Sequence, residues 1–235
     1  MQNIRTQMIL GENSLEKLRN SHVLIVGVGG VGGYSVEALV RSGVGSITIC
    51  DHDTVSLSNI NRQLCALHST IGEYKVDVLY KRSLDINPNI KIRALKEYYT
   101  KDNRDEILDL EYDYIIDAID SVTSKIDLIK SATSKNIPII SAMGTGNKLD
   151  PSKFQICDIS KTSVCPLARV MRKELKNRGI YKHKVLFSTE IPRKPEQLDE
   201  IPDGKGNVPG SISFVPSVAG LMIAGYVINE IVGEK

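Results

Sequence analysis

The chain of 235 residues carries a nearly balanced charge, with 30 lysine and arginine residues against 28 aspartate and glutamate residues. This balance excludes a polycationic, histone-like binder, although it leaves room for a local basic patch. Hydrophobic residues make up 41% and charged residues 25% of the chain. Both values are ordinary for a globular protein, and the length suits one large α/β domain.

The sequence shows no sign of export or of a membrane anchor. Its first residues lack a continuous apolar segment, and the longest apolar run, residues 218–228, is short against the ~20 residues that a membrane-spanning helix needs. The four cysteines form no C-x-x-C pair, so we expect neither a disulfide framework nor a closed zinc site. We therefore expect a cytoplasmic protein without membrane contact.

Short apolar runs alternate with helical segments over the first 150 residues. The pattern predicts strands at 22–27, 46–51, 90–95, 113–117 and 137–142 and helices at 34–42, 71–87 and 121–136, and residues 14–20 are predicted to end a short amphipathic helix. This alternation is typical of a doubly wound parallel sheet, a Rossmann-like α/β fold.

The character of the sequence changes near residue 150. Strands are predicted at 154–159 and 185–189, and helices at 166–177 and 216–232. The segment 191–210 contains four prolines and three glycines, which predicts a long irregular loop, a candidate lid over the acceptor. We assign residues 1–150 to a nucleotide-binding region and 151–235 to an acceptor-facing C-terminal region of the same domain.

A glycine-rich turn follows the first predicted strand and precedes a helix. It contains G-x-G-x-x-G, formed by Gly27, Gly29, Gly30 and Gly32. Glycine lets the backbone turn tightly and approach a phosphate, and the helix amino end offers free N–H groups. Asp51 ends the next strand, where a carboxylate accepts ribose hydroxyls. The pattern predicts an adenine-nucleotide site, with NAD as the open alternative to ATP.

Polar side chains beyond the second strand favour a triphosphate over NAD. Asp53, Asn59 and Arg62 lie in the polar segment 51–63, and Lys75 follows. A triphosphate with Mg²⁺ needs extra cations for its charge and carboxylates for the metal. Asp120, just past the strand at 113–117, is the candidate metal ligand. Solvated surface charges would have the same spacing, so the spacing alone does not decide.

A combination of motifs resembles the ubiquitin-activating-enzyme-like adenylyltransferases over residues 5–145. It consists of Arg5 with Gly11, the glycine turn, Ser58-Asn59-x-x-Arg62-Gln63, Lys75 and Asp117-x-x-Asp120-Ser121. Three later segments, 160–169, 187–192 and 210–216, resemble the tRNA threonylcarbamoyladenosine dehydratase family within that superfamily. The resemblance implies an adenylation fold of the ubiquitin-activating-enzyme type with a C-terminal extension.

The resemblance also implies a role for each matching residue. The four glycines would form the phosphate loop, Asp51 would hold the ribose, and Asp120 would bind Mg²⁺. The implied phosphate contacts are Asn59, Arg62 and Lys75, with Asp53 beside them at the nucleotide. Arg5 would cross a homodimer interface into the ATP site of the partner. The implied catalytic residues are Arg5, Arg62, Lys75 and Asp120.

The implied activity is an ATP-dependent, adenylate-forming modification of tRNA. Adenylation of the threonyl carboxylate of N6-threonylcarbamoyladenosine, next to the anticodon, would lead to cyclisation with loss of water. The alternative is adenylation of the C-terminal glycine of a small sulfur-carrier protein, although the zinc-binding C-x-x-C pairs of those branches are missing. Cysteine-desulfurase or sulfur-acceptor proteins are further possible partners.

Two features of the segment after residue 164 bear on the acceptor. Cys165 precedes Pro166, a good first helical residue, so we expect a structural thiol at the helix cap. A basic stripe with spacing i, i+3, i+4, i+7 is formed by Arg169, Arg172, Lys173 and Lys176, and Leu167, Val170, Met171 and Leu175 are expected to face the core. Such a stripe can neutralise tRNA phosphates, or it can be an ordinary solvated face. The resemblance favours tRNA.

Overall fold

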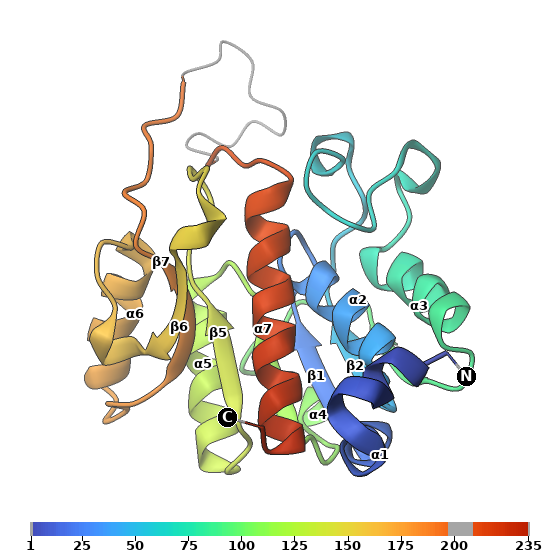
Figure 1. Cartoon of the computed structure of the whole chain (residues 1–235). Helices are drawn as coiled ribbons and strands as arrows, with labels where there is room; N and C mark the ends of the chain where they lie inside the picture. The colour runs from blue at the N-terminus through green and yellow to red at the C-terminus, as the bar shows by residue number, and fades with distance from the viewer. Residues whose placement is uncertain (1, 197–208, 235) are drawn as a thin grey trace.

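A seven-stranded sheet with helices on both faces organises the computed structural model, which describes residues 2–196 and 209–234 (Figure 1). The strands are β1 (His22–Val26), β2 (Ser46–Cys50), β3 (Lys91–Leu95), β4 (Tyr114–Asp117), β5 (Ile139–Ala142), β6 (Phe154–Asp158) and β7 (Lys184–Ser188). Each lies within two residues of a predicted strand, and the predicted doubly wound α/β fold is confirmed.

The strand order places a crevice at the carboxyl ends of the central strands. The order is β3-β2-β1-β4-β5-β7-β6, and all neighbours are parallel except the edge pair β6 and β7. Central strands such as β1 and β4 are buried on both faces, which explains their continuous apolar runs. The chain winds outward in opposite directions from β1 and β4. The loops at their carboxyl ends therefore diverge, and ligands of such sheets bind there.

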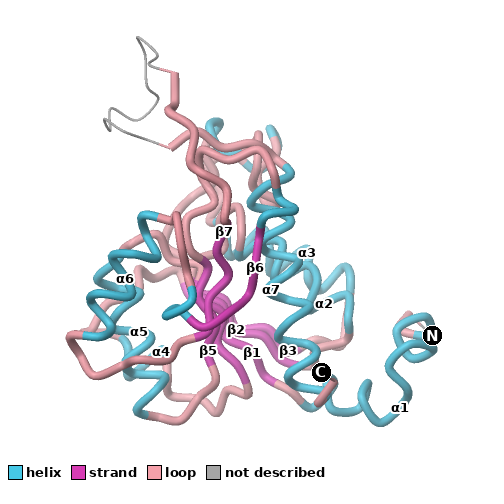
Figure 2. Tube along the Cα trace, turned by 60° about the vertical axis from the view of Figure 1, so that its left-hand side comes forward, coloured by secondary structure: helices cyan, strands magenta, loops and turns pink. Residues whose placement is uncertain are grey.

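The helices form one layer on each face of the sheet (Figure 2). One face carries α1 (Ile4–Asn20), α2 (Gly32–Ser42), α3 (Lys75–Ile86) and α7 (Phe214–Val232), and the other carries α4 (Arg104–Ile107), α5 (Val122–Ser134) and α6 (Pro166–Lys176). Each layer encloses its own buried apolar cluster against the sheet. Burial of both sheet faces is thus the main source of stability.

Three helices differ from the sequence prediction. Helix α1 begins at Ile4, so residues 14–20 are its end, as the sequence predicts, but the helix is longer than the short one expected, and it bends at Gly11, whose φ is 77°. Its first turns expose Met8 and Ile9, so no buried apolar face marks them in the sequence. Helix α3 begins at Lys75 rather than residue 71, because the preceding residues pair with residues 53–55. The four-residue α4 is too short to show a helical period.

Helix α7 is longer than the apolar run that marks it in the sequence. It has 19 residues with a mean hydropathy of 1.6 in its most apolar 18-residue window, so by length and composition alone it could cross a membrane. The helix predicted over 216–232 is thus nearly the whole of α7, whereas the apolar run 218–228 covers only its middle. In the structure 56% of that window is buried, and α7 packs on α2, β4 and β5 in the manner of a core helix.

The C-terminal region continues the same sheet through β6 and β7. The functional boundary at residue 150 stays a prediction. Most of the predicted lid, residues 197–208, lies outside the described residues, and the described parts at 191–196 and 209–210 have no regular secondary structure. The lid also stays a prediction.

Gly220 allows the close packing of α7 on α2, and this contact can be tested by substitution. A Cβ atom there would lie 2.2 Å from the Val31 carbonyl oxygen and 3.0 Å from the Tyr34 Cβ. Gly220→Ala should therefore lower the free energy of unfolding by about 1–3 kcal/mol, the usual cost of overpacking. Gly225 of the same helix has no atom within 4 Å of such a Cβ. Gly225→Ala should instead raise the free energy of unfolding by about 0.5–1 kcal/mol, because alanine has a higher helix propensity than glycine.

Urea denaturation of the two variants measures both values. Equal effects at the two positions would contradict the close contact between α2 and α7.

Candidate active site

A cleft of about 750 Å³ lies at the carboxyl ends of five neighbouring strands. In strand order, its wall contains Tyr98 after β3, Asp51 and Asp53 after β2, Gly27, Gly29 and Gly30 after β1, Asp120 after β4, and Thr145 after β5. Asn59, Arg62 and Lys75 complete it from the segment between β2 and α3. The cleft therefore brings together nine of the residues that the sequence predicts for a nucleotide site.

The glycines of the turn after β1 serve two different purposes. Gly27 has φ 86°, and a Cβ there would lie 2.6 Å from the Ala118 carbonyl oxygen. A Cβ at Gly32 would lie 1.9 Å from the Gly27 carbonyl oxygen, so the fold itself excludes side chains at these two positions. A Cβ at Gly29 would meet only Gln63 Nε2, at 3.7 Å. Packing does not require glycine at position 29, and the backbone there lines the cleft.

The amino end of α2 offers free donors beside this turn. The Val28 N–H donates to Asp51 Oδ2 at 2.8 Å, and the Gly33 N–H donates to the Gly29 carbonyl at 3.0 Å. Within residues 2–196 and 209–234, the N–H groups of residues 29–32 have no protein acceptor. Free N–H groups at a helix amino end attract anions such as phosphate.

Asp51 is held rigidly at the end of β2. Its Oδ2 accepts the Val28 N–H, and its Oδ1 accepts the Asp53 N–H at 2.9 Å. Each carboxylate oxygen can accept a second hydrogen bond. The side chain is therefore oriented by the turn after β1 and still has acceptor capacity for a ligand hydroxyl.

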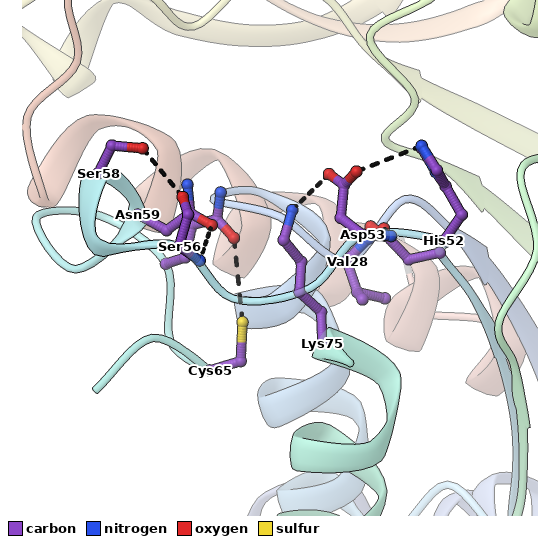
Figure 3. Close-up of polar contacts among 10 residues, drawn as sticks. Val28, His52, Asp53, Ser56, Ser58, Asn59, Cys65 and Lys75 are labelled. Carbon is purple, nitrogen blue, oxygen red and sulfur yellow. Dashed lines mark hydrogen bonds and ion pairs between the residues drawn. The ribbon is translucent and has the colours of Figure 1, made fainter. Parts of the chain in front are cut away.

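Lys75 and Asp53 form an ion pair across the cleft wall (Figure 3). Lys75 Nζ lies 2.6 Å from Asp53 Oδ2, and His52 Nε2 lies 3.3 Å from Asp53 Oδ1. The Lys75 side chain is 5% exposed, whereas that of Asp53 is 50% exposed. Asp53 thus neutralises the lysine from the solvent side, and its carboxylate is already engaged with two side chains.

Arg62 is a partly buried cation without a carboxylate partner among the described residues. Its Nη1 donates to the Ser58 carbonyl and to Asn61 Oδ1, each at 2.8 Å, and no acidic oxygen within the described ranges lies within 4.0 Å. Burial lowers the pKa of the Arg62 guanidinium. An anion in the cleft would offset this desolvation.

Asn59 shapes the segment that carries Arg62. Its Oδ1 accepts the Ser56 N–H at 3.2 Å, and its own carbonyl accepts the Gln63 N–H at 2.9 Å. The side-chain NH₂ has no acceptor in the part of the chain that the structure describes, so it is available for a phosphate oxygen.

Asp120 supplies the uncommitted carboxylate of the cleft. It is exposed and makes no hydrogen bond or ion pair with any described residue. Asp51, His52 and Asp53 offer further ligand atoms, all within 4.8 Å of one another. Carboxylate oxygens are the ligands that Mg²⁺ prefers, usually one or two together with substrate phosphates. The residues present therefore fit a magnesium ion.

A buried ion pair supports the turn that carries Asp120. Lys125 Nζ lies 2.9 Å from Asp117 Oδ1, and both side chains are 0% exposed. The same Asp117 oxygen accepts the Ile119 N–H at 3.1 Å. The pair thus anchors residues 118–120 to α5.

Arg5 and Gly32 do not line the cleft. Gly32 is buried under the turn. Arg5 is exposed on α1, whose amino end packs near Gly43, before β2 begins. In Figure 1, α1 lies at the opposite end of the sheet from the loops after β1 and β2. Arg5 therefore does not reach the cleft of its own chain, and its implied role in the cleft of a partner stays a prediction.

The basic stripe of α6 is only partly a free surface. Arg169, Lys173 and Lys176 are exposed, but Arg172 Nη1 donates to the carbonyl and hydroxyl oxygens of Thr162 at 2.8 and 2.5 Å. Val170, predicted to face the core, is 45% exposed. The core-facing residues are Ala168, Met171 and Leu175, because spacing i, i+3, i+7 follows the helical period and Val170 falls to one side.

The cysteines are free thiols, and three of them are buried: Cys50, Cys65 and Cys165. Burial raises the pKa of Cys50 to about 12, so this thiol stays protonated. Cys165 occupies the N-cap position of α6 without a side-chain capping bond, as the sequence predicts.

The sequence analysis assigns no role to Gln63, which belongs to a quoted motif, and it missed other cleft residues, among them Tyr98, Thr145 and Ser211. Tyr98 and Thr145 follow strands β3 and β5, so the strand-end rule that points to Asp51 and Asp120 could have found them. Ser211 lies just before α7 and gives no such signal.

Comparisons with known proteins identify relatives over nearly the whole chain. The sequence profile of the ThiF family matches residues 2–235. The tRNA threonylcarbamoyladenosine dehydratase of Bacillus subtilis is 46% identical over 239 residues, which cover 98% of this chain and 94% of that protein.

Two solved structures of the Escherichia coli tRNA N6-threonylcarbamoyladenosine dehydratase also match. The complex with AMP has a TM-score of 0.89 at 32% identity, covering 97% of this chain and 93% of that one. The complex with ATP has a TM-score of 0.89 at 31% identity, covering 99% and 94%. The chain belongs to the ThiF family.

Proposed function

We propose that this chain is an ATP-dependent tRNA-modifying enzyme, which adenylates the threonyl carboxylate of N6-threonylcarbamoyladenosine in tRNA and so allows its cyclisation. The observation that carries the proposal is one cleft that combines helix-end amides, the cation Arg62 and the carboxylate Asp120, none of which has a protein partner of opposite character within the described ranges. Relatives of similar length and the same fold carry the dehydratase name and bind ATP and AMP.

The order of the strands supports one orientation of the nucleotide in the cleft. Asp51, at the end of β2, would accept the ribose hydroxyls, which leaves the space near Tyr98 after β3 for the base. The phosphates would then lie over the turn after β1, against Arg62 and Lys75. Arg62 gains a counter-ion in this arrangement, and Lys75 can share its charge between Asp53 and a phosphate.

The chemistry requires a better leaving group on the threonyl carboxylate. One carboxylate oxygen attacks the α-phosphorus of ATP, the bond to the β-phosphate oxygen breaks, and pyrophosphate leaves. The carbamoyl group then attacks the carboxyl carbon of the acyl-adenylate and gives up one N–H proton. AMP leaves and takes the former carboxylate oxygen with it. Proximity within one side chain favours this closure. Cations and amides at the phosphates stabilise the negative charge that develops.

Asp120 would hold Mg²⁺, with Asp51 and Asp53 as neighbouring carboxylates. When bound, the ion would neutralise part of the phosphate charge. Homodimer formation would bring Arg5 to the cleft of the partner. Cysteine-desulfurase or sulfur-acceptor partners and a cytoplasmic location remain predictions of the sequence.

A sulfur-carrier acceptor is the less favoured alternative. It uses the same ATP chemistry on a C-terminal glycine. The paired cysteines of those branches are missing, whereas the chain-wide relatives carry the tRNA activity in their names.

Mass spectrometry of nucleosides tests the proposed function directly. The protein is incubated with ATP, Mg²⁺ and tRNA that contains N6-threonylcarbamoyladenosine. We expect that nucleoside to lose the mass of one water, with one AMP formed per nucleoside converted. Asp120→Asn is the matched variant, because it removes one charge from an exposed side chain. It should stop conversion while the unfolding midpoint is unchanged.

An unchanged nucleoside despite bound ATP would reject the proposal. Pyrophosphate exchange that requires a carrier protein would support the alternative instead. Normal turnover of Asp120→Asn would reject the metal role of that residue.

Gly29→Ala tests whether the turn after β1 meets a phosphate. The fold accommodates the methyl group, but the methyl group would displace a phosphate from the free amides. ATP affinity, measured by calorimetry, should fall about tenfold or more, the equivalent of one lost charge-assisted hydrogen bond. The free energy of unfolding should change by less than about 0.5 kcal/mol. Equal ATP affinity in Gly29→Ala and wild type would place the phosphates elsewhere.

The free part of the α6 stripe is tested by charge reversal. The double variant Lys173→Glu/Lys176→Glu should weaken tRNA binding and reduce the slope of log K against log salt by about 2, because two phosphate contacts are lost. Arg172→Gln should chiefly lower stability, by about 1 kcal/mol, through its bonds to Thr162. Binding titrations at several salt concentrations give the slope. Unchanged tRNA affinity of the double variant would make the stripe an ordinary solvated face.

A further inference from the structure

The loop after β5 is a part of the cleft wall to which the proposed nucleotide orientation assigns no role. Thr145 lines the cleft from this loop. Strand β5 is the neighbour of β4, with Ser141 opposite Asp117 in the register. Thr145 therefore lies on the far side of Asp120 from the turn after β1.

A buried lysine fixes the backbone on both sides of Thr145. Lys148 is 4% exposed, and its Nζ donates to the Gly144 carbonyl at 2.9 Å and the Gly146 carbonyl at 3.3 Å. No carboxylate within the described ranges lies within 4.0 Å of this ammonium group. Burying a lysine without an acidic partner is costly. Here the ammonium instead holds the two carbonyls that flank Thr145.

The loop is held from the next segments as well. The Asn147 N–H donates to the Gly210 carbonyl at 2.7 Å, and Asn147 Oδ1 accepts the Gly210 N–H at 2.6 Å. Glu190 accepts the backbone N–H groups of Leu149 and Asp150. These bonds hold Thr145 in one position at the wall of the cleft.

The same loop touches the amino end of α6. A Cβ at Gly144 would lie 3.8 Å from Cys165 Sγ and 3.9 Å from the Leu167 Cβ. A tRNA whose backbone lies on the exposed cations of α6 would reach the cleft at this end. The acceptor must also approach the α-phosphorus from the side away from the leaving pyrophosphate. Both considerations place the acceptor at β5, beyond the nucleotide.

We propose that the Thr145 hydroxyl donates a hydrogen bond to the threonylcarbamoyl group of the tRNA nucleoside, and that Lys148 is the positioning residue for Thr145. The inference rests on the proposed function. It adds the side of the cleft at which the acceptor binds and the residue that contacts it.

Steady-state kinetics with tRNA and ATP varied separately test the contact. Thr145→Val replaces the hydroxyl with a methyl group of similar size. We expect the KM for tRNA to rise, or kcat to fall, about tenfold, as for one hydrogen bond to a charged group. The KM for ATP should stay within about twofold, and Thr145→Ser, which keeps the hydroxyl, should restore most of the activity.

Lys148→Met tests the positioning role, with Lys153→Met as the matched control. Lys153 is half-exposed and near in sequence, but it does not line the cleft. Lys148→Met should change the tRNA parameters as Thr145→Val does and should add less than about twofold in the Thr145→Val background, because both changes remove one contact. A merely structural lysine would instead cost the same factor in either background and would raise the KM for ATP.

The outcomes separate this inference from the proposed function. Wild-type kinetics in Thr145→Val, or an equal rise in the two KM values, would overturn the acceptor contact. Additive effects of the two substitutions would overturn the positioning role. If Lys148→Met does not fold, the comparison of Thr145→Val with Thr145→Ser still decides the contact. A wild-type protein that binds ATP but cyclises no tRNA would reject the proposed function, and this inference with it.

Discussion

The cleft depends on how closely the turn after β1 approaches β4. A side chain at position 27 would clash with the Ala118 carbonyl, and a side chain at position 32 would clash with the Gly27 carbonyl. Both positions therefore require glycine. This contact brings the amino end of α2 next to the residues that follow β4. Free N–H groups and the Asp120 carboxylate consequently share one small space, which is the combination that a nucleotide with a metal ion requires.

The charges around the cleft divide into those that hold the structure and those that remain available. Lys125 and Asp117 are fully buried and compensate each other, and removing one partner of such a pair typically costs about 3–5 kcal/mol. Lys75 is buried but its partner Asp53 is half-exposed, so a phosphate in the cleft can compete with Asp53 for the lysine. Arg62 and Asp120 have no ionic partner among the described residues. Ligand binding can therefore use the last two without disturbing the fold.

The sequence alone predicts the sheet and the nucleotide half of the cleft well. The strands are buried on both faces, so their apolar runs are continuous, and the residues just after them meet at one edge by the rules of parallel sheets. Gly29, Asp51 and Asp120 were found in this way, although their chemical roles stay predictions.

What the sequence could not provide depends on contacts between distant segments. Arg172 has the sequence spacing of a surface cation, but its guanidinium donates a hydrogen bond to the Thr162 carbonyl. Arg172 is therefore not a free cation of the α6 stripe. Lys148 looks like an ordinary loop lysine until the β5 loop folds its carbonyls around the ammonium group. Arg5 could not be placed at either end of the sheet, because the exposed first turns of α1 carry no periodic pattern.

The sheet also separates two tasks that one reaction needs. Strands β1 to β4 and the segment between β2 and α3 contribute the cleft residues expected to bind ATP, whereas the β5 loop lines the opposite end of the cleft and contacts the amino end of α6. The two ends meet at Asp120, where the α-phosphorus would face the acceptor. Because β6, β7 and α6 contribute no residue to the described wall of the cleft, changes in these elements can alter which acceptor enters while the adenylation chemistry stays the same. Acceptor choice in this chain is therefore expected to depend on residues after 143, and ATP binding on residues before 121.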